Sequence, residues 1–225
     1  MKLYKYIAKK TKKIRYKIVK IFLKILTPNL YKYIDIETFT NRSFKLKLES
    51  IERVIRPAIK FMKEYFKQKV LNGCEIGIAT GINSQIILKE LNIKKFYLID
   101  IWDNYDGYKW LWSKHNYELV KKKFQNDARI IIKKDYSKNV VKEIKDNSLD
   151  FIYIDGNHQY DFVYQDISLW YSKIKINGII SGHDISLPEV INAVKDYCNN
   201  NEIEYIINPP DWYFIKEKEL KKKEI

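Results

Sequence analysis

The sequence predicts an α/β protein with a mostly parallel sheet of seven strands and helices on both faces. Three observations support this fold class. Short apolar runs alternate with segments of helical periodicity, most glycines lie beside the runs, and the last two runs flank a Pro-Pro turn. Alternating strands and helices are typical of a parallel sheet covered on both faces. The seven runs are residues 74–79, 96–99, 128–132, 149–154, 178–181, 203–207 and 212–216.

Helical segments separate the first five runs, as connections between parallel strands require. Apolar residues also recur at helical spacing over residues 48–69, which predicts a helix before the first strand. The last two runs are joined only by Asn208-Pro209-Pro210, so we expect them to form a terminal antiparallel hairpin. The other helices are expected at residues 83–92, 114–126, 138–145, 160–174 and 187–199.

The positive charge is concentrated at the N-terminus. The 225-residue chain has a net charge of +14, and its first 26 residues hold ten Lys and Arg and no acidic residue. The segment from Lys216 to Ile225 holds five Lys and three Glu, which leaves only +2 for residues 27–215. The expected domains are a basic extension (1–46), an α/β domain (47–216) and a charged tail (217–225).

In residues 1–26 apolar side chains fall at helical spacing and lysines fill the other faces, which predicts a basic amphipathic helix. Such a helix can lie on an anionic membrane surface, or it can pack on the domain or on a second subunit of a homo-oligomer. The sequence leaves both interpretations open. Nucleic-acid binding is disfavoured because only five of the 42 basic residues are Arg, which bases favour for bidentate contacts.

Cysteine content and hydropathy predict a cytoplasmic protein. Cys74 and Cys198 are too few for a disulfide framework, which fits a reducing compartment. No segment has the ~20 consecutive apolar residues of a membrane span, and lysines interrupt the N-terminus too often for a signal peptide. Peripheral attachment to the inner face of the membrane stays open.

A glycine motif predicts a nucleotide-type ligand at the end of the first strand. Glu75, Gly77 and Gly81 form the pattern E-x-G-x-x-x-G before a helix whose N–H groups can hold a polar ligand group. The dinucleotide pattern G-x-G-x-x-G is absent, which counts against a nicotinamide-type oxidoreductase. Asp100 ends the second strand, where a carboxylate can accept both hydroxyls of a ribose. Together these residues predict an adenosine-type ligand.

Further polar residues follow the fourth and fifth strands. Asp155 and His158 come after the fourth run, and His183 and Asp184 come directly after the fifth. We expect Asp155, His183 and Asp184 to converge if the two strands are neighbours, because the carboxyl ends of neighbouring parallel strands lie at one edge of the sheet. Carboxylate oxygens with an imidazole suit a divalent ion such as Mg²⁺ or Mn²⁺. Two of the three histidines in the chain lie here beside Asp, so we interpret the group as a functional site.

With the glycine motif and Asp100, the segment LDFIYIDGNHQYDFVYQDISLWYSKIKINGIISGHD resembles class I S-adenosylmethionine-dependent methyltransferases. The resemblance is greatest to the small metal-dependent O-methyltransferases related to macrocin O-methyltransferase, which act on sugar hydroxyls. It covers about residues 70–216, and its most specific part is I-D-G-x-H…Y…D…G-H-D. It implies a Rossmann-like fold.

The resemblance also implies a role for each motif residue. Trp102 directly follows the second strand within the aromatic segment 101–113, and we expect it to contact the cofactor. The chain has Gly156-Asn157-His158 where G-D-H is frequent in this branch, which removes one negative charge near the site. The implied cofactor residues are Glu75, Gly77 and Gly81 at the methionine end, Asp100 at the ribose, and Asp135 and Tyr136 at the adenine. The implied reaction residues are Asp155, His183 and Asp184 as metal ligands and His158 as the base, with Asp155 also counted as catalytic.

The sequence therefore predicts metal-assisted transfer of a methyl group from S-adenosylmethionine to a hydroxylated small molecule or glycan. The alternative is a non-enzymatic adaptor that keeps the fold and binds membrane or nucleic acid. The adaptor is less favoured because it has no need of His158, His183 and Asp184. No readable code in the sequence identifies the acceptor.

Overall fold

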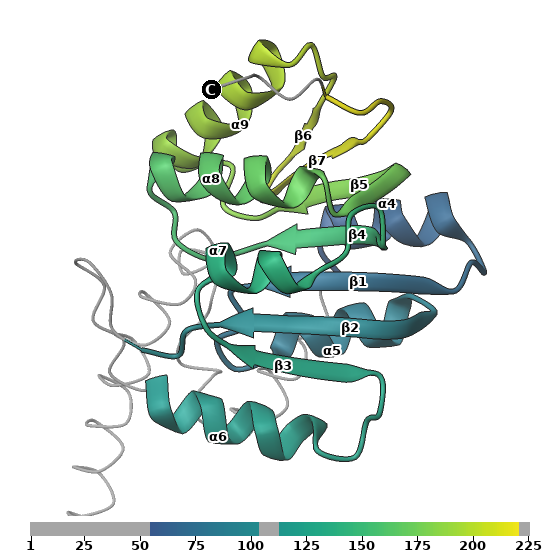
Figure 1. Ribbon diagram of the computed structural model, residues 1–225, viewed down its shortest axis with the longest axis vertical. Coiled ribbons are helices and arrows are strands. Elements are labelled where there is room, and N and C mark those ends of the chain that lie inside the picture. Colours follow the sequence, from purple (N-terminus) through teal and green to yellow (C-terminus); the bar gives the residue numbers. More distant parts are fainter. Residues whose placement is uncertain (1–54, 104–112, 221–225) are drawn as a thin grey trace, which may run out of the picture. The chain divides into compact units, whose positions relative to one another are not determined.

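The computed structural model describes residues 55–103 and 113–220, which lie within one compact unit, residues 55–225. The expected N-terminal helix (1–26) and most of the aromatic segment after Trp102 lie outside the described residues. Figure 1 shows the described part as a twisted sheet with helices against it.

The sheet has seven strands in the order β3-β2-β1-β4-β5-β7-β6, which confirms the predicted fold class. The first five strands are parallel, β7 is antiparallel to β5, and β6 is antiparallel to β7. The predicted hairpin is therefore present, with Pro209 and Pro210 at its turn. The strands are β1 (Leu71–Ile76), β2 (Ile93–Asp100), β3 (Ile130–Lys134), β4 (Leu149–Ile154), β5 (Ile174–Gly182), β6 (Ile206–Asn208) and β7 (Asp211–Ile215).

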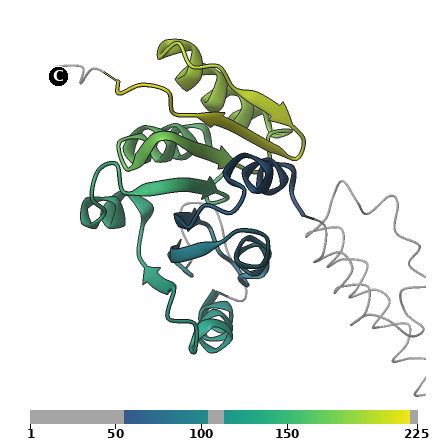
Figure 2. The same cartoon turned by 90° about the vertical axis from the view of Figure 1, so that its right-hand side faces the viewer.

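The described helices cover both faces of the sheet, as Figure 2 shows in an edge-on view. One hydrophobic core contains side chains of α4, α5 and α6, and the other contains side chains of α7, α8 and α9. The helices are α4 (Pro57–Phe66), α5 (Ile82–Glu90), α6 (Ser113–Phe124), α7 (Ser137–Val140), the 3₁₀ turn η2 (Val141–Glu143), α8 (Tyr160–Tyr171) and α9 (Pro188–Asn200).

Strand β4 has the bounds that the sequence predicts, whereas β5 begins four residues before the expected start. All six residues of β4 are buried, so its apolar run is uninterrupted. In β5, exposed Asn177 has a left-handed backbone with φ of 62°. It precedes Gly178, and an Asn-Gly pair is typical of a turn in sequence, which is why the predicted strand begins only at Gly178. The pairing with β4 shifts register there, so the strand absorbs an irregularity instead of ending. The α-helix expected over residues 138–145 is shorter in the structure, because α7 ends at Val140 and continues directly as the 3₁₀ turn η2.

The C-terminal end of the described chain is held by a buried lysine. Lys216 has no exposed surface, and its Nζ donates to Asn147 Oδ1 at 3.1 Å, to the Ile174 carbonyl at 2.9 Å and to Glu219 Oε1 at 2.9 Å. The Tyr171 hydroxyl donates to the Lys218 carbonyl at 2.7 Å. Residues beyond β7 therefore contribute contacts to the folded unit.

The strand order places a change of direction between β1 and β4. The chain builds outward from β1 to β2 and β3, and then from β4 to β5 on the other side. In open α/β sheets, ligands bind at such a point, outside the carboxyl ends of the strands. A ligand site is therefore expected at the loops after β1, β2, β4 and β5.

Candidate active site

The loops after β1 and β4 touch through a glycine. Gly77 has φ of 84°, and a Cβ built on it would overlap the carbonyl oxygen of Asp155. Its N–H donates to the Ile99 carbonyl at 2.9 Å, so the loop also joins β2. Gly81, with φ of 74°, is the N-cap of α5, and a Cβ there would lie 2.9 Å from the Phe124 ring. Both glycines are therefore required by backbone conformation and by space.

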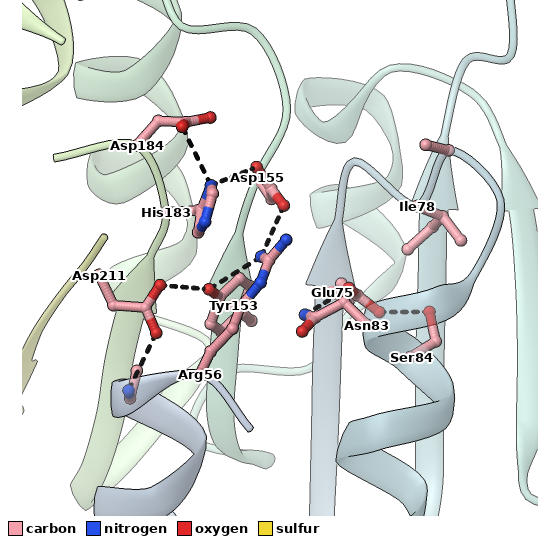
Figure 3. Close-up of polar contacts among 12 residues, drawn as sticks. Arg56, Glu75, Ile78, Asn83, Ser84, Tyr153, Asp155, His183, Asp184 and Asp211 are labelled. Carbon is pink, nitrogen blue, oxygen red and sulfur yellow. Dashed lines mark hydrogen bonds and ion pairs between the residues drawn. The ribbon is translucent and has the colours of Figure 1, made fainter. Parts of the chain in front are cut away.

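Glu75 points into the protein and braces the start of α5. Its side chain is buried, and its carboxylate accepts hydrogen bonds from Asn83 Nδ2 at 2.9 Å and from the Ser84 hydroxyl. Burial raises the pKa of Glu75 to about 7 although these bonds oppose the shift. Figure 3 shows this carboxylate directed at the first turn of α5. Glu75 thus fixes the helix terminus that the glycine motif exposes.

Asp100 and Trp102 frame the same glycine loop. Asp100 Oδ2 accepts the N–H groups of Ile78 at 2.8 Å and Ala79 at 2.9 Å, and Oδ1 accepts that of Trp102 at 2.7 Å. Burial raises the pKa of Asp100 despite these bonds. The Trp102 indole is buried and donates through Nε1 to the Ala79 carbonyl at 3.0 Å. Ala79 and Trp102 both have left-handed backbones, strain that is concentrated at functional sites.

Asp135 and Tyr136 lie in the exposed loop after β3, at the same edge of the sheet. Asp135 Oδ1 accepts the N–H of Tyr136 at 2.7 Å and the side-chain amide of Asn139 at 2.8 Å. The Ser137 hydroxyl donates to the buried carboxyl of Asp166 on α8. This loop is therefore shaped by its own polar contacts and by α8.

The polar residues after β4 and β5 converge as the sequence predicts (Figure 3). His158 Nε2 lies 3.0 Å from Asp184 Oδ2 and 3.8 Å from Asp155 Oδ1. His183 Nδ1 lies 3.2 Å from Asp184 Oδ1 and 3.6 Å from Asp155 Oδ1. The backbone N–H of Asp155 bonds the Ile76 carbonyl and that of His183 bonds the Ile154 carbonyl, so the strand ladders continue into the site.

Burial and neighbouring charges act in opposite directions on the pKa values of this cluster. Burial raises the pKa of Asp155, but the Arg56 guanidinium and then the two imidazoles more than offset it, and the pKa is lowered. The pKa of Asp184 is likewise held well below its usual range against burial by bonds to His158 and His183. Burial lowers the pKa of His158, but its carboxylate partners raise it to about 10. Without a bound cation His158 is an imidazolium, which accepts a proton only after losing its own.

Arg56 is a site residue that the sequence analysis missed. Its Nη1 donates to Asp155 Oδ2 at 2.7 Å and to the Tyr153 hydroxyl at 3.0 Å. Tyr153 donates to Asp211 Oδ1 at 2.7 Å, and Asp211 Oδ2 accepts the N–H of Ala58 at 2.9 Å. The available signals were weak: Arg56 is one of five arginines and precedes Pro57, and Asp211 is an acid directly after the Pro-Pro turn.

The cluster fits a small divalent cation. Asp155, His158 and Asp184 each offer one ligand atom, and these atoms lie within 4.8 Å of one another. Adjacent ligands around an octahedral ion at about 2.1 Å lie about 3 Å apart. A cavity of about 10 Å³ lined by Asp155, His158 and His183 has room for one ion or water. His183 is the imidazole ligand that the family resemblance implies, but the compact group contains His158, and His183 flanks it.

The Rossmann-like strand order, with β7 antiparallel beside β5, is shared with solved methyltransferase structures. A family model described as a methyltransferase domain matches residues 74–185. A search of curated proteins finds no match. Residues 74–185 are therefore similar to a methyltransferase domain, and S-adenosylmethionine is the cofactor that this family implies.

Solved structures share the fold at low sequence identity. A protein from Corynebacterium glutamicum gives a TM-score of 0.55 at 11% identity, over 85% of this chain and 99% of its own. The O-methyltransferase NovP gives 0.51 at 14% identity, over 76% of this chain and 80% of its own. Precorrin-6y C5,15-methyltransferase from Geobacter metallireducens gives a TM-score of 0.52 at 12% identity, over 72% of this chain and 89% of its own.

Among the described residues, no helix is long and apolar enough to span a membrane.

Proposed function

We propose that the protein transfers a methyl group from S-adenosylmethionine to a hydroxyl oxygen of a sugar or another hydroxylated small molecule, assisted by a divalent cation. The observation that carries this proposal is the Asp155–His158–Asp184 group beside the glycine loop of a methyltransferase fold. The metal-dependent branch related to macrocin O-methyltransferase combines these features. NovP, a solved structure with the same fold, is itself an O-methyltransferase.

The donor set suits oxygen methylation because a neutral hydroxyl is a weak nucleophile. Attack on the sulfonium carbon requires an oxygen that loses its proton as the new bond forms. When bound, a divalent cation lowers the pKa of a coordinated hydroxyl and fixes its orientation. Asp155 and Asp184 would hold the cation together with one imidazole, and the second imidazole would lie close enough to accept the hydroxyl proton.

The glycine loop is the proposed cofactor site. The Gly77 turn and the start of α5 would let backbone N–H groups approach a ligand closely. Glu75 fixes the N-terminus of α5 by accepting a hydrogen bond from Asn83. Asp100 would bind the ribose hydroxyls through Oδ1, which accepts the N–H of Trp102, because Oδ2 already accepts the N–H groups of Ile78 and Ala79. Asp135 and Tyr136 would lie at the adenine, on the exposed loop of the same edge.

The test is methyl transfer by the full-length protein from labelled S-adenosylmethionine to nucleotide sugars and glycan extracts, with and without a chelator. We expect label uptake into at least one fraction, loss of uptake on chelation, and recovery with Mg²⁺ or Mn²⁺. D155N is the matched variant, because it keeps the shape of a metal-ligating carboxylate and removes its charge. Uptake that is insensitive to the chelator would contradict the role of the cation, and absence of uptake would contradict the reaction.

We also propose that residues 1–26 attach the protein to an anionic membrane surface. The support is the ten basic residues of this segment in an amphipathic pattern, with a nearly neutral remainder of the chain. Sedimentation with phosphatidylserine vesicles should retain the full-length protein and lose a variant without residues 1–27. Equal retention of both proteins would eliminate this proposal, and a loss of self-association in the shorter variant would favour a homo-oligomer contact.

A further inference from the structure

The two carboxylate oxygens of Asp155 have different partners. Oδ2 accepts a hydrogen bond from Arg56 Nη1 at 2.7 Å. Oδ1 faces the site, 3.6 Å from His183 Nδ1 and 3.8 Å from His158 Nε2. Figure 3 shows Arg56 and the imidazole of His183 on different sides of this carboxylate. Asp155 therefore presents only one oxygen to the place where a cation would sit.

Arg56 is held in place by contacts outside the cation group. Its Nη1 also bonds the Tyr153 hydroxyl, and its guanidinium carbon lies 5.4 Å from the Tyr153 ring centre. Tyr153 is fully buried and bonded in turn to Asp211, which has no exposed surface. Asp211 also accepts the N–H of Ala58, so the start of α4 is fixed through both its backbone and Arg56. The guanidinium is thus anchored independently of any ion.

We propose that Arg56 is a positioning residue that sets the cation preference of the site by occupying Asp155 Oδ2. This inference rests on the proposed function, since it concerns the same cation. With Oδ2 occupied, Asp155 can ligate through one oxygen only. Ca²⁺ takes six to eight oxygen ligands and uses bidentate carboxylates, whereas Mg²⁺ and Mn²⁺ prefer six ligands in octahedral geometry. The arrangement therefore disfavours Ca²⁺ relative to the smaller ions.

The experiment measures the ratio of the Ca²⁺ and Mn²⁺ dissociation constants by calorimetry on the full-length protein without cofactor or acceptor. The positive charge of Arg56 repels both divalent ions alike, so its electrostatic effect cancels in this ratio. In R56M, which frees Oδ2, we expect the ratio to fall about tenfold in favour of Ca²⁺. In R56K, which keeps one charged donor, we expect it to stay within about threefold of the wild-type value.

R129M is the matched control. Arg129 also forms an ion pair, with 2.6 Å between its Nη2 and Asp127 Oδ2, but this pair is not part of the cluster. R129M should leave the ratio unchanged. Melting curves show whether R56M is folded; if it is not, Y153F, which removes one anchor of Arg56, should move the ratio in the same direction by a smaller factor. An unchanged ratio in the folded variant overturns the inference while leaving methyl transfer intact. A wild-type protein that binds no Mn²⁺ overturns the cation-assisted reaction as well.

Discussion

A side chain at Gly77 would overlap the carbonyl oxygen of Asp155, so the glycine loop and the cation group are joined by direct backbone contact. Gly77 also has a left-handed backbone, which an L side chain adopts only with strain. The loop after β1 and the loop after β4 therefore cannot move apart or rotate independently without breaking this junction.

Replacing Gly77 with Ala should lower the free energy of unfolding by more than about 3 kcal/mol, since backbone strain and overlap add. G156A is the control: a Cβ at Gly156 would lie 3.3 Å from Ile76 Cγ2, and its φ lies outside the left-handed range. That variant should lose less than about 1 kcal/mol. Urea denaturation measures both, and similar losses in the two variants would refute the junction.

The stability of the protein should depend on pH through Asp166. Burial raises the pKa of this carboxyl to about 7, against the opposing bond from Ser137. Between pH 4 and 7 the folded protein holds a proton that the unfolded chain releases, so the contribution of this group to stability falls as pH rises through 7. The asparagine of D166N does not titrate.

We therefore expect D166N to gain about 2–3 kcal/mol relative to wild type between pH 5 and pH 8. Urea denaturation at each pH gives the difference, in which the titration of other groups cancels. Stability curves that run parallel across this range would show that Asp166 is ionised throughout.

The two imidazoles should separate into a ligand and a base. The compact group contains His158, so H158A should weaken Mn²⁺ binding more than tenfold. H183A should keep Mn²⁺ affinity within about threefold of wild type and lower kcat by about a hundredfold or more at saturating Mn²⁺. Calorimetry and methyl-transfer rates distinguish the variants. The reverse pattern would restore the sequence-based assignment, with His183 as ligand and His158 as base.

Asp100 should support both the fold and the cofactor. D100N keeps one carbonyl acceptor for the three N–H groups of Ile78, Ala79 and Trp102, so we expect a loss of about 1–3 kcal/mol in stability. We also expect S-adenosylmethionine to bind at least tenfold more weakly, which calorimetry measures. Urea denaturation measures the loss of stability separately, which distinguishes damage to the loop from loss of a cofactor contact. Unchanged cofactor affinity in folded D100N would assign Asp100 a structural role only.

Most of the fold could be predicted because strands that are buried on both faces of a parallel sheet consist of continuous apolar residues. Strand β4 is buried along its whole length, and its bounds match the prediction. Strand β2 begins at Ile93, three residues before the predicted start, because Lys94 and Lys95 are exposed there and interrupt the run. Strand ends at the surface follow backbone pairing, which the composition of a single strand does not encode.

The convergence of Asp155, His183 and Asp184 could also be predicted, because the ends of neighbouring strands in a parallel sheet meet at one edge. Arg56 could not. It reaches Asp155 from a helix 99 residues away in sequence, through contacts that depend on how α4 packs. The orientation of Glu75 was equally hidden, since only the packing of α5 shows that its carboxylate faces Asn83 and Ser84.

The anchoring of Lys216 sets a practical limit on shortening the protein. Its ammonium group is shared between Asn147, the Ile174 carbonyl and Glu219, and the Lys218 carbonyl accepts the Tyr171 hydroxyl. Expression variants that stop at the last strand would leave buried polar groups without partners. Fusion partners and affinity tags therefore belong after residue 220. The residues directly after β7 should be kept as part of the folded domain.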